Sequence, residues 1–576
     1  MARTTVVLVV GLLAGCQPSG GKGDPVLVQQ HFAGLKAVMS RPDLAVTGAI
    51  LSKPESQRLR AEVTRKLAAA MPGWFGAGTT AGTNHAVALT PVVDALLEGE
   101  SFLEVRGDAQ EVRSWAWAAR VEAAAGLASQ ELGRVLSSVQ GGAAPAAGST
   151  AWELAGTAGA PGARFFSTNG WVVMGRGAGA FDVLRDRLRS GHAPAPALSN
   201  LVWRAEADLA AVAKLAGWAE APPGPVAQWP RVQATAESRH GRVRTQAQLE
   251  YARPLGLVLQ PWKVPVSVLT DPLVGFTAMQ GSENWLSRVA WLADMGVKEW
   301  PREFYFWSLA SRPWQQYFAG PVSSPTNLMA QVAPVLPVKL LTNSMWQGQS
   351  FGLRLTNQAR RLELRGLPFF APFLEAIREE ETEMLFGGLF LPAKGAPPAP
   401  PELISQVAGR TNLVFYDWEV TGRVVTVTNS SPAGPAGPAR RRVDTNQIGR
   451  LVQFKHLAQF GTMMSAPVAA LPTTPSGEVA VSGSAWIDAV VPALGETVTE
   501  VTLQGPSKLG LTRQSQLGFG SLELMYLLRW VENPGFPGWI EPAPLQPRRR
   551  PERSGAAAGA PPVPTVPPAS PAPKKP

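Results

Sequence analysis

The sequence predicts an α+β protein made of two diverged tandem repeats, in which helices pack on largely antiparallel sheets. Three patterns lead to this fold class: amphipathic helix periodicity, strands paired around tight turns, and a similar order of both in the two halves. The chain has 576 residues, too many for one hydrophobic core, and 45% of them are hydrophobic, as in an ordinary folded protein. We therefore expect two α+β modules, over residues 25–257 and 258–540.

The first clear helix is expected to follow Pro54. Leu59, Val63 and Leu67 recur at intervals of four residues, while charged residues cover the opposite face. Such an apolar stripe packs against a core. Pro72 should end the helix, because proline has no amide hydrogen to continue it.

Two strand pairs in the first half are joined by tight turns. Asn169-Gly170 separates two short apolar strings, and this dipeptide supplies the positive φ angles of a type I′ hairpin turn. A second pair meets at His240-Gly241, where apolar and polar residues alternate over residues 232–249. This alternation predicts a hairpin with one face in water.

The same order of elements recurs in the second half. Residues 171–175 lead through a short helix to residues 200–202, as residues 384–387 lead to residues 412–414, where Asn412 lies 212 positions after Asn200. The second half is longer by an insertion near residues 428–475. Duplication explains the pattern, and chance matches of short apolar strings are the alternative.

The first sixteen residues carry the clearest functional signal. Arg3 gives a short cationic start, an apolar run follows, and Leu13-Ala14-Gly15-Cys16 closes it. The run is well below the ~20 residues that span a bilayer. Cys16 is the only cysteine of the chain, so no intrachain disulfide can form.

This N-terminus resembles the signal peptide and lipobox of bacterial lipoproteins. The resemblance implies a signal peptide over residues 1–15, lipidation of Cys16, a tether over residues 16–24, and membrane binding through acyl chains, each worth ~0.8 kcal/mol per buried methylene. Because Gln17 rather than Asp follows the cysteine, the sorting pattern of the class implies the outer membrane of the cell envelope, with the body facing the periplasm. An ordinary secretory signal or a short membrane helix is the alternative.

The charge balance argues against nucleic acid as a partner. The formal net charge is +10, and the Pro/Ala-rich tail over residues 541–576 holds six basic and two acidic residues, hence four of those ten charges. The remaining charges form no basic and aromatic array of the kind that nucleic-acid modules carry. We expect the tail to be disordered.

Three strings imitate chemical motifs without their structural context. Gly175 to Ala180 fits the dinucleotide pattern G-x-G-x-x-A, but it follows the return strand of a hairpin. Gly348 to Gly352 fits G-x-S-x-G, but a strand follows where a helix is required. The acidic run over residues 379–383 is typical of a solvated face. The histidines have no metal-ligand spacing, so we predict neither a metal nor a cofactor; they are His31, His85, His192, His240 and His456.

Nineteen tryptophans against five tyrosines are the oddity of the composition. Most are expected in the core, since they stand in apolar strings. The remainder leave room for a groove between the two halves that contacts a glycan or a partner protein.

The body also resembles large exported bacterial proteins of unknown function that carry duplicated α+β modules. The similarity lies in residues 412–419, in the Gln-x-Gln-Leu strings that begin at Gln246 and Gln514, and in the terminal helix over residues 522–531. It implies a fold and no activity. We predict a membrane-anchored envelope lipoprotein with a non-enzymatic binding or scaffolding body. Two alternatives stay open: a carrier or chaperone for a lipid or other apolar ligand, and a carboxylate-dependent enzyme acting on cell-wall glycans, which needs two facing carboxylates about 5 to 9 Å apart.

Overall fold

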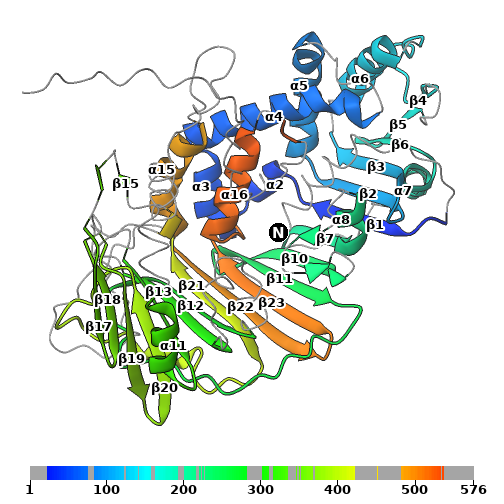
Figure 1. Cartoon of the computed structure of the whole chain (residues 1–576). Helices are drawn as coiled ribbons and strands as arrows, with labels where there is room; N and C mark the ends of the chain where they lie inside the picture. The colour runs from blue at the N-terminus through cyan, green and yellow to red at the C-terminus, as the bar shows by residue number, and fades with distance from the viewer. Residues whose placement is uncertain are drawn as a thin grey trace, which may run out of the picture. The chain divides into compact units, whose positions relative to one another are not determined.

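One antiparallel sheet of 19 strands runs through the described part of the chain in the computed structural model (Figure 1). The prediction of an α+β fold with a largely antiparallel sheet is confirmed. The predicted signal peptide and tail, and nearly all of the predicted insertion, lie outside the described residues. The structure describes residues 23–537, except 76–82, 122–124, 141, 157–161, 193–199, 216–219, 222–223, 226–227, 282–300, 310–314, 335–344, 347–348, 351, 367–369, 422–449, 452–481 and 534.

In the first half of the chain, residues 23–257, nine strands pair in the order β4-β5-β6-β3-β2-β1-β7-β10-β11. A separate short pair, β8 and β9, lies between β7 and β10 in the chain. The bounds are β1 (Val26–Phe32), β2 (Ser101–Gly107), β3 (Val112–Arg120), β4 (Ala151–Glu153), β5 (Ala163–Thr168), β6 (Trp171–Arg176), β7 (Leu201–Asp208), β8 (Glu220–Ala221), β9 (Gly224–Pro225), β10 (Arg231–Arg239) and β11 (Arg242–Glu250).

In the second half, residues 258–537, ten strands pair in the order β23-β22-β21-β12-β13-β14-β20-β19-β18-β17. Strands β15 and β16 form a separate pair. The bounds are β12 (Leu273–Gln280), β13 (Glu303–Leu309), β14 (Gln316–Pro321), β15 (Met345–Trp346), β16 (Gln349–Ser350), β17 (Arg354–Gln358), β18 (Arg361–Arg365), β19 (Phe373–Glu379), β20 (Thr382–Gly388), β21 (Leu413–Val420), β22 (Glu496–Gly505) and β23 (Lys508–Ser515).

The two halves meet where β11 pairs with β23. Eight residue pairs join these strands, from Val243 opposite Ser515 to Glu250 opposite Lys508. The chain beyond β11 continues the contact, since the amide of Tyr251 donates to the carbonyl of Ser507 in the β22–β23 turn at 2.9 Å. The two predicted modules therefore share one continuous sheet.

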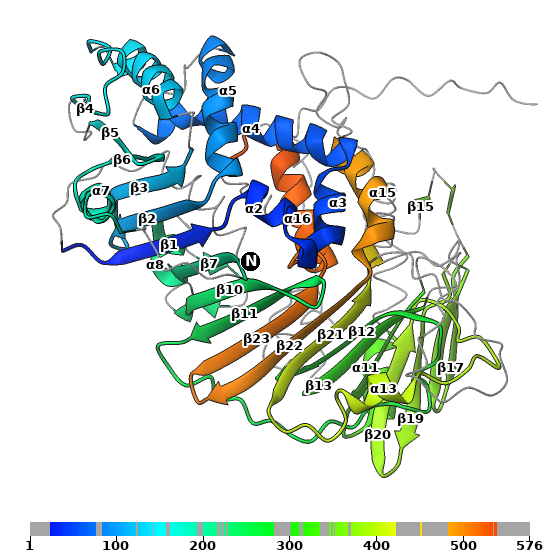
Figure 2. The same ribbon diagram turned by 180° about the vertical axis from the view of Figure 1, so that it is seen from behind.

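Helices of both halves pack together beside the central strands. Figures 1 and 2 show α3 and α16 side by side beneath α4. Ile50 of α3 and Leu59 of α4 pack in one apolar cluster with residues of α15 and α16, and Trp486 of α15 donates its indole N–H to Ser56 at 2.9 Å. The bounds are α2 (Leu35–Met39), the 3₁₀ helix η1 (Pro42–Leu44), α3 (Ala45–Leu51), α4 (Pro54–Trp74), α5 (Thr83–Glu98), α6 (Ala125–Gln140), α7 (Gly179–Arg189), α8 (Leu209–Leu215), α11 (Pro325–Val332), α13 (Pro401–Ser405), α15 (Ser482–Leu494) and α16 (Ser521–Glu532).

Period-two alternation decides which side of the central strands is buried. Ala234 and Ala236 of β10 and Val243 of β11 pack against Val38 of α2 and Leu44 of η1. Because successive residues of a strand point to opposite faces, the residues between them face away from these helices. The central hairpin has one covered face and one polar face, as its sequence predicts.

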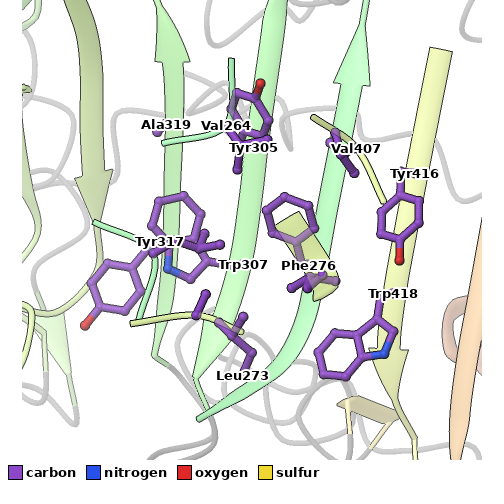
Figure 3. Packing of buried hydrophobic residues seen from close by; sticks show 14 of the residues in the cluster. Val264, Leu273, Phe276, Tyr305, Trp307, Tyr317, Ala319, Val407, Tyr416 and Trp418 are labelled. Atoms are coloured by element: carbon purple, nitrogen blue, oxygen red, sulfur yellow. The ribbon is translucent and has the colours of Figure 1, made fainter. Parts of the chain in front are cut away.

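An aromatic cluster fills the core of the second half (Figure 3). Phe276, Tyr305, Trp307 and Tyr317 come from the neighbouring strands β12, β13 and β14, and the rings of Trp307 and Phe386 stack with their centroids 5.8 Å apart. Large rings bury much apolar area and hold these strands together.

The predicted local elements are present with one change of boundary. Helix α4 begins at Pro54, but it continues through Pro72 to Trp74, since a proline in the last turn removes one hydrogen bond and leaves the rest of that turn intact. Both predicted hairpin turns have positive φ angles at their two central residues; these are Asn169 at 48°, Gly170 at 78°, His240 at 51° and Gly241 at 77°.

Candidate functional site

Five neighbouring strands at the centre of the sheet, β7, β10, β11, β23 and β22, present a polar face. Arg204, Thr235, Gln246 and Thr512 stand opposite one another on the first four of these strands. Directly opposite residues of an antiparallel pair share a face, so these four side chains form one row. The row joins strands from both halves of the chain.

A depression of about 330 Å³ lies over these strands. Ala234, Ala247 and Leu511 also line it. Their side chains point to the opposite face of the sheet, because successive residues of a strand point to opposite faces. Gly510 leaves room for the Gln504 side chain, because a Cβ at position 510 would collide with its amide nitrogen. Seven polar side chains line the depression and are here named the central polar face: Arg204, Gln233, Thr235, Gln246, Gln248, Gln504 and Thr512.

The side chains of the central polar face have no polar partner in the described part of the chain. Within the described residues, none of the seven makes a side-chain hydrogen bond or an ion pair, and each is exposed or half-buried. On the same face of β11, the buried Nε of Arg244 also has no hydrogen-bond partner in the described part of the chain. Free donors and acceptors that converge on one depression are the expected features of a site for a polar ligand.

The carboxylates around the central polar face have partners of their own. Glu206 lies 3.4 Å from Arg231, Glu237 accepts a hydrogen bond from Asn200 at 3.1 Å, and Glu500 accepts two from Arg410 at 3.1 and 3.3 Å. Glu206 and Glu500 are therefore paired with arginines, whereas Glu237 has a neutral amide partner and stands directly opposite Arg244 on β11. Arg204 remains as an exposed cation among neutral amides and hydroxyls.

A second polar group is buried between the sheet of the second half and α16. Arg450 Nη1 lies 2.8 Å from Asp417 Oδ1 and 3.6 Å from Glu419 Oε2, and Nη2 donates to Thr277 at 3.2 Å. The backbone N–H of Ser521, at the start of α16, donates to Glu419 at 2.7 Å. Gly275, two residues before Thr277 on β12, makes room for the Arg450 side chain, since a Cβ on this glycine would lie 3.1 Å from it.

Burial and charge act against each other in this cluster. Burial raises the pKa of Glu419 and Asp417 raises it further, whereas Arg450 lowers it; the net shift is upward. Burial alone would lower the pKa of Arg450, but the two carboxylates hold it above its ordinary value. A charge group this deeply buried is stable only with its partners in place.

Glu303 at the start of β13 is the third unusual polar residue. It is 6% exposed and accepts hydrogen bonds from the amide of Lys263, at 2.8 Å, and from the hydroxyl of Tyr305. Burial raises the pKa of Glu303 to about 7, although the contact with Lys263 opposes the shift. This carboxyl fixes the segment that enters the second half against the sheet.

The predicted lipidation residue Cys16 and the cleavage residues Leu13, Ala14 and Gly15 lie outside the described residues. The Gln-x-Gln-Leu strings differ from each other in place, because the first lies within β11 whereas the second runs past the end of β23.

The strings that imitate chemical motifs occupy ordinary connections. Gly175 to Ala180 joins β6 to α7, and β6 pairs antiparallel with both β3 and β5, so no βαβ unit surrounds the string. The acidic run over residues 379–383 forms the turn between β19 and β20. Gly348 is not among the described residues, and Ser350 ends β16.

The histidines that the structure describes are dispersed. His31 Nε2 lies 2.7 Å from Glu100 Oε1, and His85 Nε2 lies 3.5 Å from Ser138 Oγ. His240 stands in the β10–β11 turn, His192 follows α7, and His456 is outside the described residues. The described chain holds no group of three residues suited to a metal ion, and none of its helices is long and apolar enough to cross a membrane.

Tryptophan is a core residue in this protein wherever its surroundings are described. Ten of the twelve described tryptophans are buried, and the two others, Trp152 and Trp229, are half-buried. None of them lines the central polar face. The groove predicted from tryptophan stays a prediction, because the side chains of the other seven tryptophans lie outside the described part of the chain.

Two features were missed in the sequence. The alternation in residues 232–249 predicted a wet face but not its neighbours, because the pairing of β11 with β23 joins segments far apart in the chain. Asp417 and Glu419 are separated by one residue within an otherwise apolar strand, which places both on one face, and this spacing was the available signal for the buried cluster.

No family model, no curated protein and no solved structure matches this chain.

Proposed function

We propose that this chain is a cell-envelope lipoprotein, anchored in the outer membrane through Cys16, whose body is a non-enzymatic binding module. The lipobox pattern at residues 13–16 supports the anchor. The observation that carries the binding role is the central polar face, where seven side chains without a partner among the described residues converge on one depression.

The chemistry of the described side chains favours binding over catalysis. Asp417 and Glu419 stand on one strand and share Arg450, and Glu419 is buried against the start of α16, whereas glycoside hydrolysis uses two carboxylates on opposed walls of a cleft. The depression is lined by polar groups, which favours a polar ligand over the apolar ligand of a lipid carrier.

The anchor is tested with Cys16→Ser. We expect this variant to leave the membrane fraction and to become soluble in the periplasm. If it stays with the membrane, lipidation at Cys16 is not what holds the chain there.

The binding role is tested by native mass spectrometry of the full-length Cys16→Ser chain, purified gently from the periplasm. We expect a mass adduct that decreases when Gln246→Leu is introduced and persists when the exposed turn residue is changed in Glu381→Gln. An adduct that both variants retain equally would place the ligand elsewhere.

We also propose that the two halves are diverged copies of one module. From the junction outward, the strands of the first half follow one another as β11, β10, β7, β1, β2, β3, β6, β5 and β4, and those of the second half as β23, β22, β21, β12, β13, β14, β20, β19 and β18. If the nine strands of each set are numbered by their order along the chain, the two sets have the same order of neighbours in the sheet. Among the described strands of the large sheet, only β17 has no counterpart in the first half.

The register of pairing supports the same proposal. Ala207, the seventh residue of β7, pairs with the third residue of β1 and the second residue of β10. Glu419, the seventh residue of β21, pairs with the third residue of β12 and the second residue of β22. Identical positions on three consecutive strands are not expected from chance likeness of short strings, because a slip of one residue exchanges the two faces of a strand.

Under this correspondence the buried ionic cluster belongs to the second copy alone. The positions that match Asp417 and Glu419 hold Ala205 and Ala207. An experimental structure of the chain tests the proposal, since nine strands should superpose in the matched order and register. A shift of register between β7 and β21 would contradict it.

A further inference from the structure

We propose that the ligand of the central polar face is a linear acidic glycan that lies across the strands with a carboxylate at Arg204. The proposal rests on the binding role proposed above and names the chemical class of the ligand.

The hydrogen-bonding groups of the face match sugar hydroxyls. Each of the four glutamines offers two N–H donors and a carbonyl acceptor, and both threonines donate and accept through one hydroxyl. A sugar hydroxyl also donates and accepts. Ala234, Ala247 and Leu511 are the apolar residues of the lining, and all other lining side chains are polar, so the depression favours a ligand rich in hydroxyls over a lipid tail.

The charge of the face selects an acid. Glu206 and Glu500 are paired with Arg231 and Arg410. The charge of Glu237, whose hydrogen-bond donor is the neutral Asn200, is balanced by Arg244 at the opposite strand position. Arg204, which is exposed, has no carboxylate left to balance it in this group. The uncompensated charge at the depression is therefore positive. A guanidinium binds a carboxylate through charge-assisted hydrogen bonds, which are about twice as strong as neutral ones.

The spacing of the row suits a linear polymer. Arg204, Thr235, Gln246 and Thr512 present one polar side chain per strand. Neighbouring strands lie about 4.8 Å apart, so the row extends roughly 14 Å and can contact successive units of a chain that crosses the strands. Because no described tryptophan lines the face, affinity comes from hydrogen bonds and charge and should fall with added salt.

The test compares two glycans by titration calorimetry against the full-length Cys16→Ser chain. The acidic probe is a strand of alternating N-acetylglucosamine and N-acetylmuramic acid from which the peptides have been removed. The neutral probe is an N-acetylglucosamine oligomer of the same length, which has a closely similar backbone without the carboxylates. We expect the acidic strand to bind about tenfold more tightly.

Three variants locate the interaction. Arg204→Gln should abolish the preference for the acidic probe, and Gln246→Leu should weaken the binding of both probes. Arg354→Gln, on the exposed strand β17, is the matched control and should change neither affinity.

Equal affinity for the two glycans, or an unchanged preference in Arg204→Gln, would overturn the proposal. Binding of an acidic peptide such as hexaglutamate with no binding of either glycan would also overturn it. In that case the binding role survives, because it is judged separately from the adduct in native mass spectrometry and from cross-linking at Gln246.

Discussion

Gly175 of β6 and Gly388 of β20 are confined by the same kind of contact. Gly175 pairs with Ala116 and Gly388 pairs with Tyr317, and a Cβ on either glycine would collide with the backbone carbonyl oxygen of the residue just before its partner. These oxygens belong to adjacent strands of the sheet and cannot move aside as a flexible side chain can. Both positions therefore require glycine for the close approach of two strands.

Gly175→Ala and Gly388→Ala should each destabilise the protein by about 1–3 kcal/mol, because a methyl group has no room at either site. The free energy of unfolding from urea denaturation measures the effect. Gly505→Ala is the control, since a Cβ at that position meets no atom within 4 Å. Equal stability of all three variants would contradict the explanation that a Cβ at positions 175 and 388 clashes with the neighbouring strand.

Arg450→Met should destabilise the protein by about 3–5 kcal/mol, because the buried Glu419 and the half-buried Asp417 would lose their cationic partner. Adding Asp417→Ala and Glu419→Ala to the same chain should restore much of the loss, since it removes the carboxylates that lost their partner and leaves alanine at the fifth and seventh positions of β21, as in β7. Denaturant titration compares the single and triple variants. A triple variant less stable than Arg450→Met would show that the carboxylates stabilise the fold without the arginine.

Glu303 should make stability depend on pH below neutrality. Its pKa is about 7 in the folded chain and 4.5 is its ordinary value, so between these two pH values the folded state holds a proton that the unfolded state releases. The contribution of Glu303 to the free energy of unfolding is complete below pH 4.5. It is lost as the pH rises through 7, which lowers the free energy of unfolding by up to about 3 kcal/mol.

Glu303→Gln keeps the acceptor for the Lys263 amide and should flatten this pH dependence, whereas Glu381→Gln, in the exposed β19–β20 turn, should leave it unchanged. Unfolding midpoints at a series of pH values provide the measurement. An identical pH slope in wild type and Glu303→Gln would assign the dependence to other groups.

The two halves should remain associated after the chain between them is cut. A protease site inserted after Val258, which is 79% exposed, allows cleavage in the native protein. The eight residue pairs between β11 and β23, together with the cluster that α3 and α4 share with α15 and α16, should hold the fragments together on size-exclusion chromatography. Separate elution without denaturant would mean that this junction is weak.

Local sequence predicted the parts of this fold that depend on neighbouring residues. Asn169-Gly170 and His240-Gly241 determine their turns through their own φ preferences, and the alternation in residues 232–249 determines which side of that hairpin is wet. The stripe that begins at Leu59 likewise determined the face that α4 buries.

Pairings between distant segments were not predictable in the same way. Nothing within β11 specifies β23 as its neighbour, because the choice depends on the helices of both halves packing together above them. The sequence therefore predicted only the part of the central polar face that lies on one hairpin. The structure was needed to show that this face extends to Arg204, Gln504 and Thr512. The ionic cluster needed Arg450 to be brought to β21 from beyond a long segment.

The most direct test of the binding role is photo-cross-linking in the native cell envelope. A benzophenone amino acid replaces Gln246 on the central polar face in one chain and Val87, which is 73% exposed on α5, in another. We predict a cross-linked product at Gln246 that is absent or much weaker at Val87. Equal products at the two positions, or none at Gln246, would contradict the account of this face as the ligand-binding surface.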